Sequence, residues 1–397
     1  MPSETFYEPV NDDKDLIDHT QVPEHHYEIS KTDFSSCILP PSSFTRRPMD
    51  IAEELKHAMQ HLPFITGELP GVGGAIKVSP DHFEVEEILP YAPCGEGEHV
   101  FITLRRKLWN TDEVAGELRR CFGLKSIDIG WGGRKDKHAL TTQTFSLLLP
   151  LSVTIAEIRS RLAGLPFEIL DVARHRNKIK TGHVAGNRFR ILLSQVPPQR
   201  LAQARAICDA LGRSGLPNFF GEQRFGIDMN NIERAVQFLD RQRAARGKKE
   251  AFIVSVLQSA LFNLWLRERM ARGEYRTILS GDVVQKTDTG GLFIVRDVDE
   301  AAERFSRGAI VYTGPIYGVK MMCAEALAAE YENRTLDAVG LDLDAFKRLK
   351  SPGTRRRALL HIEDLTIECA PGGLLFSFSL PSGAYATMVM REFMRAP

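Results

Sequence analysis

One stretch of the chain places a single carboxylate among cations and a histidine. It reads GGRKDKHALTTQ over residues 132–143, and Asp136 is its one acidic residue. A carboxylate beside a cation stays ionised, because the positive charge lowers its pKa. The ionised form suits a nucleophile or an electrostatic stabiliser, and it suits a structural ion pair equally well. Charge alone therefore leaves the role of Asp136 open.

Histidines and cysteines give little support to a metal or thiol centre. His57 and His61 have i, i+4 spacing, but HAMQH lacks the glutamate of the HExxH pattern. His25 and His26 fall in a stretch that we predict to be a flexible tail. The six cysteines are scattered without a CxxC pair, which is typical of reduced thiols in a cytosolic protein. We therefore predict no metal site.

A carboxylate pair for glycoside hydrolysis is the other catalytic pattern in the sequence. Glu84 with Glu86 or Glu87 could supply the acid and the base that this reaction needs. The edge of an exposed strand explains the three glutamates as well or better. A hydrolase acting through carboxylates remains a minor alternative.

The zero formal charge of the chain hides two oppositely charged parts. Residues 1–35 contain nine acids and two lysines, a net charge of −7, so the remainder carries +7. Three acid-poor basic runs lie in that remainder, over residues 174–190, 241–249 and 347–357. Such runs bind nucleic acid by releasing counterions from phosphates, although each is also compatible with a solvated surface. No apolar run approaches about 18 residues and the N-terminus lacks a signal-peptide pattern, so we expect a cytoplasmic protein that does not enter a membrane.

The periodicity of the sequence predicts a mixture of strands and helices. Their order shows no regular alternation of strand and helix, which favours an α+β fold over a doubly wound sheet. The expected strands are 83–86, 100–104, 126–131, 167–172, 187–193 and 374–380. The expected helices are 51–61, 111–123, a short one after the capping-box pair Thr154 and Glu157, 198–211, 254–270 and 384–394.

Several motifs, taken in order, resemble those of the TruD family of tRNA pseudouridine synthases. The resemblance covers about residues 70–396 and leaves out residues 1–60. The matching segments are Lys77 ahead of DHFEVEE (81–87), GEGEH (95–99), GRKDKHA (133–139) with Thr142-Gln143, GNRF (186–189), PNFFGEQRFG (217–226), and LPSGAYAT (380–387) with Arg391-Glu392.

This resemblance implies a division of the chain into three parts. Residues 61–220 and 356–397 would form the catalytic domain, with a mixed, largely antiparallel sheet. Residues 221–355 would form an inserted α+β domain specific to the family. Residues 1–60 lie outside the resemblance, and their low periodicity and many polar residues predict a flexible acidic extension.

The resemblance also implies a reaction and its site. A uridine of tRNA, by resemblance at position 13, would become pseudouridine, with Asp136 as the essential carboxylate. Lys77 would pair with Asp136, Asn187 would position it, and Phe189 would stack on the flipped base. Whether Asp136 adds covalently or removes a ribose proton stays open.

The remaining motif residues are candidates for contacts with substrate. They are Phe83, Arg134, Lys135, His138, Arg188, Arg224 and Tyr385. The resemblance implies no cofactor and tRNA as the partner, and it leaves other structured RNA open. The oligomeric state is unknown from the sequence, and we favour a monomer. A catalytically inactive RNA-binding or RNA-folding protein is the alternative, which the presence of all four catalytic candidates argues against.

Overall fold

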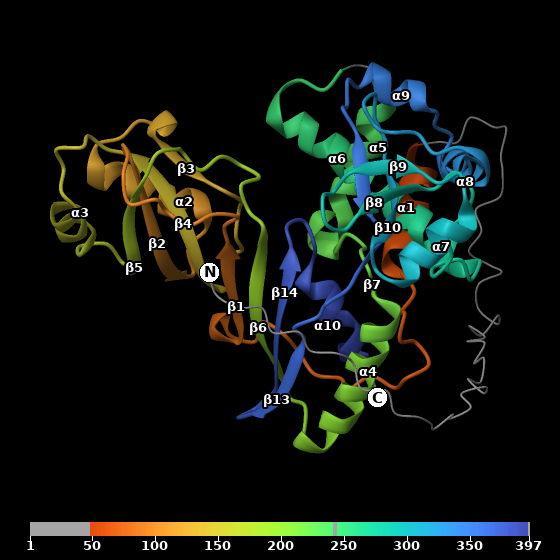
Figure 1. Cartoon of the computed structure of the whole chain (residues 1–397), viewed down its shortest axis with the longest axis horizontal. Coiled ribbons are helices and arrows are strands. Elements are labelled where there is room, and N and C mark those ends of the chain that lie inside the picture. The colour runs from red at the N-terminus through yellow and green to blue at the C-terminus, as the bar shows by residue number, and fades with distance from the viewer. Residues whose placement is uncertain (1–47, 241–243, 396–397) are drawn as a thin grey trace, which may run out of the picture. The chain divides into compact units, whose positions relative to one another are not determined.

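Helices and strands follow one another without regular alternation, as the sequence predicts for an α+β fold (Figure 1). This architecture is seen in a computed structural model that describes residues 48–240 and 244–395. The predicted fold class is confirmed. Most of the predicted extension, including its acidic stretch and the histidine pair His25-His26, lies outside the described residues.

The larger sheet joins strands from distant parts of the sequence. Its strand order is β13-β14-β6-β1-β4-β2-β5, with β3 paired to β4. Within the described residues its pairings are antiparallel except that of β1 with β4, which is parallel. The bounds are β1 Phe83–Ile88, β2 His99–Lys107, β3 Ile129–Trp131, β4 Leu140–Leu148, β5 Glu168–His175, β6 Gly186–Ser194, β13 Thr366–Ala370 and β14 Gly373–Pro381. The predicted strand at 126–131 is shorter, because Ser126–Asp128 form a 3-10 turn.

Strand β14 shows the alternation that the sequence predicts. Leu374, Phe376, Phe378 and Leu380 are buried, whereas the residues between them are partly exposed. Side chains of a strand point alternately to its two faces, so the apolar set forms one face of the sheet. β14 lies so close to the start of β6 that a Cβ at Gly186 would be 2.4 Å from the carbonyl oxygen of Leu380. Gly186 is thus a close-approach glycine, because a larger residue would collide with β14.

Four helices form two hydrophobic clusters with this sheet. Their bounds are α2 Thr111–Phe122, α3 Ile155–Leu162, α4 Leu201–Ser214 and α10 Ala386–Met394. Helices α4 and α10 pack with β6 and β14, and α2 and α3 pack with β2, β4 and β5. The predicted capping box is present at the start of α3, where Thr154 and Glu157 cap each other. Asn110 and Glu113 form a second capping box that begins α2.

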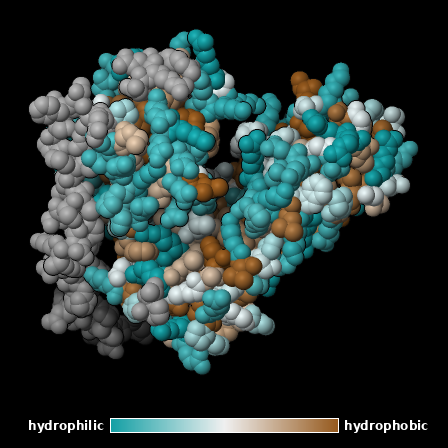
Figure 2. All heavy atoms as spheres, turned by 180° about the vertical axis from the view of Figure 1, so that it is seen from behind, coloured by the Kyte–Doolittle hydropathy of each residue, from teal (hydrophilic) through white to brown (hydrophobic). Residues whose placement is uncertain are grey.

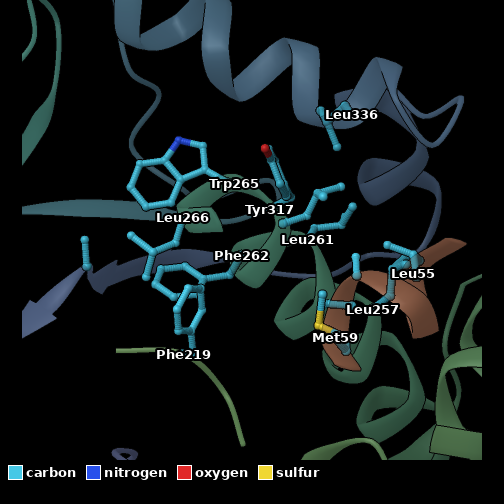
Figure 3. Close-up of a cluster of buried hydrophobic side chains, with 14 of the residues drawn as sticks. Leu55, Met59, Phe219, Leu257, Leu261, Phe262, Trp265, Leu266, Tyr317 and Leu336 are labelled. Atoms are coloured by element: carbon cyan, nitrogen blue, oxygen red, sulfur yellow. The ribbon is translucent and has the colours of Figure 1, made fainter. Parts of the chain in front are cut away.

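The other large hydrophobic cluster surrounds helix α6. Figure 3 shows Phe262, Trp265 and Leu266 of this helix together with Phe219 and Tyr317. The helices of this part are α1 Pro48–Gln60, α5 Asn230–Asp240, α6 Gly247–Ala271, α7 Val298–Ser306, α8 Ala326–Asp337 and α9 Leu343–Arg348. A second sheet has the order β11-β10-β8-β9, with β8 Val283–Lys286, β9 Leu292–Ile294, β10 Ile310–Ile316 and β11 Thr354–Arg357.

Helix α1 corrects the prediction that residues 1–60 are flexible throughout. The helix thought possible at 51–61 is present, and it belongs to the core. Leu55 and Met59 are buried in the α6 cluster, next to Leu257 in Figure 3. Their apolar side chains lie one helical turn apart, so one face of α1 is removed from water by packing on α5 and α6.

A short strand pair connects segments on either side of the predicted insertion. β7 (Leu216–Pro217) pairs with β12 (Leu359–Leu360). The α6 cluster draws on α1 and on residues between Phe219 and Leu359, together with Met388. The predicted domain boundaries at 220/221 and 355/356 stay a prediction.

Hydrophilic side chains cover most of the face seen in Figure 2, with hydrophobic ones scattered among them. Within the described residues, helices long and apolar enough to cross a bilayer are absent.

Candidate active site

Asp136 lies in the loop between β3 and β4, and its carboxylate faces Lys77. The distance from Lys77 Nζ to Asp136 Oδ2 is 2.5 Å. The other oxygen, Oδ1, accepts a hydrogen bond of 3.1 Å from the backbone N–H of His138. The side chains are 44% exposed for Asp136 and 31% for Lys77, so solvent reaches both. The structure therefore brings together the predicted carboxylate and its predicted cation.

The surroundings of Asp136 favour its ionised form. Burial on its own raises the pKa of this carboxyl, but the hydrogen bonds from the Lys77 ammonium and the His138 N–H outweigh it. The pKa consequently lies below the ordinary value of 3.8. At neutral pH the group is a carboxylate that can act as a nucleophile or a base.

The backbone of Lys77 is held in an unusual conformation. Its φ is +59°, in the left-handed region that residues other than glycine seldom adopt. Its ammonium lies over the Phe83 ring, 4.7 Å from the ring centre. A conformation of this kind costs about 1 kcal/mol or more, and such strain concentrates at functional sites.

Three phenylalanines form a series of ring contacts that begins at this ion pair, where Lys77 lies over Phe83. Phe83 meets Phe189 edge to face at 6.2 Å, and Phe189 stacks on Phe378 at 5.5 Å. Phe189 is 7% exposed and belongs to the sheet's hydrophobic cluster. The predicted stacking residue is therefore at least a core residue, joined to Asp136 through Phe83 and Lys77.

Lys135 and Asn187 contact each other instead of pointing freely toward substrate. Lys135 Nζ donates to Asn187 Oδ1 at 2.8 Å and pairs with Glu87 Oε2 at 2.9 Å. The Lys135 side chain is 9% exposed and that of Glu87 is 0% exposed. We predicted that Lys135 touches substrate and that Asn187 orients Asp136. In the structure the Asn187 oxygen is bound by Lys135.

Arg134, His138 and Arg188 are the more exposed candidates. Arg134 pairs with Asp112 at 3.1 Å on the surface, and His138 contributes its backbone N–H to Asp136. Arg188 pairs with Glu86 at 3.0 Å. Because strand side chains alternate, Arg188 points to the face opposite that of Asn187 and Phe189. The structure thus does not bring Arg188 to the Asp136 side of the sheet.

Arg224 and Tyr385 form a separate cluster with Phe220 and Arg356. The Arg224 guanidinium lies 5.9 Å from the Phe220 ring centre, and the Arg356 guanidinium lies 4.0 Å from the same ring centre. Tyr385 meets Phe220 edge to face at 5.9 Å. Burial lowers the pKa of Arg356 to about 10 and also lowers that of Arg224. Sequence reasoning missed Arg356, whose run of three arginines resembled a solvated surface.

Much of the predicted basic surface is used within the protein. Arg174 donates to backbone carbonyls at Gly97 and Val153, among others. Arg190 pairs with Glu84 at 3.1 Å, and Arg355 pairs with buried Glu332 at 2.6 Å. Part of the 241–249 run lies outside the described residues. The basic runs are therefore weaker evidence for nucleic acid than their charge alone indicates.

Among the residues that the structure describes, there is no group of three or more His, Cys, Asp or Glu that could hold a metal ion. His57 of α1 and His61, one residue beyond its end, stack on each other at 4.2 Å.

Comparison with known proteins decides the family. The family model described as tRNA pseudouridine synthase D (TruD) matches residues 61–244 and 228–393. A tRNA pseudouridine synthase D of Anaeromyxobacter dehalogenans (strain 2CP-C) is 41% identical over 347 residues, which cover 85% of this chain and 98% of that protein. The chain belongs to the TruD family.

Other relatives support the same assignment. A tRNA pseudouridine synthase D of Thermus thermophilus is 39% identical, over 85% of this chain and 93% of that protein. A crystal structure of a putative TruD from Methanosarcina mazei has the same fold, with a TM-score of 0.65 at 24% identity, over 86% of this chain and 98% of that one. The resemblance seen in the motifs is confirmed, and membership of this family makes the chain an enzyme of the isomerase class.

Glu87 and Gln143 lie next to Lys135 and Gly133 in the candidate site, and our reasoning had assigned neither of them to it. Gln143 Nε2 donates to Glu87 Oε2 at 3.1 Å and to the carbonyl of Gly133 at 2.7 Å. A signal for Glu87 was present in the sequence. It follows Phe83 and Val85 at intervals of two, so it belongs to the apolar face of its strand, where an acid requires a partner.

Proposed function

We propose that this chain converts a uridine of tRNA to pseudouridine, with Asp136 as the essential carboxylate. Membership of the TruD family supports the reaction class. The observation that carries the choice of residue is the Lys77–Asp136 ion pair, because it keeps a solvent-accessible carboxylate ionised. The position 13 of the substrate, a monomeric state and a cytoplasmic location stay predictions.

The reaction moves one base without a cofactor. The bond between N1 of uracil and C1′ of the ribose breaks, the uracil turns while it is bound, and C5 forms a bond to C1′. C5 then loses its proton to solvent, and N1 carries a proton in the product. An ionised Asp136 can attack the sugar or remove a ribose proton, and both roles require the carboxylate form.

The phenylalanine group offers a face for the base that leaves the RNA stack. Phe189 stacks on Phe378 and meets Phe83 edge to face, and the flipped base would add a further ring to this group. Stacking of a base on an aromatic side chain contributes about 1–3 kcal/mol, which offsets part of the unstacking cost.

The Arg224 cluster, in this proposal, contacts an RNA phosphate. Arg224 donates to Ser259 at 3.1 Å and to Ser255 at 2.7 Å, and no carboxylate of the described residues pairs with it. Burial raises the pKa of Tyr385, so its hydroxyl stays protonated and can donate. A half-buried cation without an acidic partner is well suited to a phosphate, since anion binding would compensate its charge.

Release of tritium from tRNA labelled at uridine C5 tests the reaction. Wild type should release tritium, and Asp136→Asn should be slower by at least about 10³-fold, because the amide can neither attack nor accept a proton. An inactive wild type would contradict the reaction. Full activity in Asp136→Asn would contradict the role of that carboxylate alone.

Salt-dependent binding tests the phosphate contact. In the Asp136→Asn background, Arg224→Gln should reduce the slope of log K for tRNA against log salt by about one. Arg307→Gln is the control, because Arg307 is an exposed arginine paired with Glu303. Equal slopes for the two variants would rule the contact out.

A further inference from the structure

A buried acid at the end of β1 lies directly across from Asn187. In the antiparallel pairing of β1 with β6, Glu87 is the register partner of Asn187. The Glu87 carboxylate is fully removed from solvent, and its Oε2 accepts from Lys135 Nζ and from Gln143 Nε2. A buried charge needs a partner and hydrogen bonds, and Lys135 supplies both.

Lys135 determines which way the Asn187 amide points. An ammonium group has three donors and no acceptor, so the amide atom that it contacts at 2.8 Å has to be the oxygen. The Nδ2 donor is consequently the end turned away from Lys135. It makes no hydrogen bond with another residue of the described ranges 48–240 and 244–395. Carboxylates and the carbonyls of uracil are both acceptors for such a donor.

The same network fixes the loop that carries Asp136. The backbone N–H of Lys135 donates to Thr111 Oγ1 at 2.9 Å, and the carbonyl of Gly133 accepts from Gln143. Thr111 Oγ1 in turn donates to Gln143 Oε1 at 3.2 Å. The loop is therefore tied at residues 133 and 135, immediately before Asp136, by side chains from α2 and β4.

We propose that Glu87 and Lys135 are positioning residues that act on the reaction through Asn187. Glu87 holds the Lys135 ammonium in place, and Lys135 holds the Asn187 amide with its donor toward the site. This inference rests on the proposed pseudouridine synthase activity. It assigns to Lys135 a role inside the protein in place of a contact with substrate.

A double-mutant cycle separates positioning from mere stability. Lys135→Met leaves the buried Glu87 carboxylate without its ion-pair partner, so the midpoint of urea unfolding should fall. Single-turnover tritium release should fall by about 10- to 100-fold, because the amide is no longer oriented. The Kd for tRNA should change by less than about twofold, since no RNA contact is lost.

The combined variant Glu87→Gln with Lys135→Met gives the decisive reading. It removes the buried carboxylate that Lys135→Met leaves without an ion-pair partner, so its unfolding midpoint should rise above that of Lys135→Met. Its rate should remain as low as that of Lys135→Met, because Asn187 still lacks its donor. A rate that recovers together with the stability would overturn the proposal.

Asn187→Ala tests whether Lys135 acts through the amide. If it does, Asn187→Ala combined with Lys135→Met is no slower than the slower of the two single variants. Rate losses that multiply would mean that the two residues act independently, which would also overturn the proposal.

The Glu332–Arg355 pair is the matched control. It too is a buried glutamate with a cation, at 2.6 Å, but it lies between α8 and β11. Glu332→Gln and Arg355→Met should lower stability and leave the rate per folded molecule unchanged. An equal rate loss here would show that the assay reports stability, and would overturn the positioning role. If wild type releases no tritium, the proposed function itself fails. An active wild type with an equally active Lys135→Met would overturn this inference alone.

Discussion

Two buried carboxylates in this molecule are satisfied to different degrees. Both oxygens of Asp282 accept from Arg269 at 2.7 Å, and Oδ2 also accepts from the Leu279 N–H. Glu87 Oε2 has two donors, whereas its Oε1 has no hydrogen-bond partner among the described residues. Burial lowers the pKa of Arg106 to about 10 although the charge of Glu87 opposes this shift, and Arg106 also contains an unpartnered buried nitrogen.

This difference separates a structural ion pair from one beside a site. Buried polar groups are normally paired, so each exception calls for an explanation. Both carboxylate oxygens of Asp282 have hydrogen-bond donors, so we interpret the Arg269–Asp282 pair as purely structural. The group around Glu87 retains hydrogen-bonding capacity beside Asp136, which is expected where local structure serves chemistry as well as stability.

Breaking the buried Arg269–Asp282 ion pair should have the largest effect on the stability of the protein. Asp282→Asn leaves Arg269 buried without its counter-charge, which should cost about 3–5 kcal/mol. Urea unfolding followed by circular dichroism measures this loss. The rate of tritium release per folded molecule should not change. A loss below about 1 kcal/mol would contradict the contrast with Glu87.

Removing the cation at the site should affect activity more than stability. Lys77→Met deprives Asp136 of a hydrogen bond that lowers its pKa, so that pKa rises and the acid limb of the pH–rate profile moves to higher pH. In wild type the rate should hold down to pH 3.8, as far as the protein stays folded. We expect about a 10- to 100-fold lower rate at neutral pH. An unmoved acid limb would contradict the assignment.

The same ion pair contributes to stability at higher pH. Asp136 has a lower pKa in the folded chain than its ordinary 3.8, so its contribution is present above 3.8 and is lost as pH falls through the lower value. Lys77→Met should lack most of this pH dependence.

Strain at Lys77 provides a smaller test in the opposite direction. Lys77→Gly relieves the positive φ and should be more stable than Lys77→Met, which also lacks the ion pair, by up to about 1 kcal/mol, with activity below that of wild type in both. Leu108→Gly is a matched control, because Leu108 also has a positive φ, of 62°, and is exposed. It should gain stability without losing activity. Thermal unfolding and tritium release measure the two effects.

The smallest effect should come from the outer face of the sheet. Arg190→Ala removes an exposed ion pair with Glu84, which should cost less than about 1 kcal/mol. Activity should change by less than about twofold, because Arg190 points away from the Phe189 face. Thermal unfolding and tritium release check both numbers. A large rate loss would show that RNA contacts this face.

Local signals in the sequence predicted much of the fold. The Thr154–Glu157 capping box and the alternation of β14 are read from neighbouring residues, and both are present. Packing over long separations was not accessible in this way. Helix α1 was assigned to a flexible tail because its partners, α5 and α6, are remote in sequence.

The sequence predicted which residues belong to the site better than it predicted which of them contact each other. The motifs identified Asp136 and Lys77, which the structure joins. The Lys135 side chain is buried because it contacts both Glu87 and Asn187. These two residues lie opposite each other in the register of β1 with β6, which the sequence alone does not show. Glu86 and Glu87 are neighbours of the same type, yet one meets surface Arg188 and the other meets buried Lys135. Composition cannot distinguish them, whereas the pleat of the strand does.

The pairing of β14 with β6 has a consequence for how the chain folds. Phe378 supports Phe189 from a strand that is separated from β6 by every element from α4 to β13. During synthesis, β1 and β6 emerge long before β14, and one edge of β6 stays unpaired in the meantime. Contacts of such long sequence separation form slowly. The aromatic support of the candidate active site is therefore completed late, and until then the unpaired edge of β6 is the part of the sheet most exposed to mispairing.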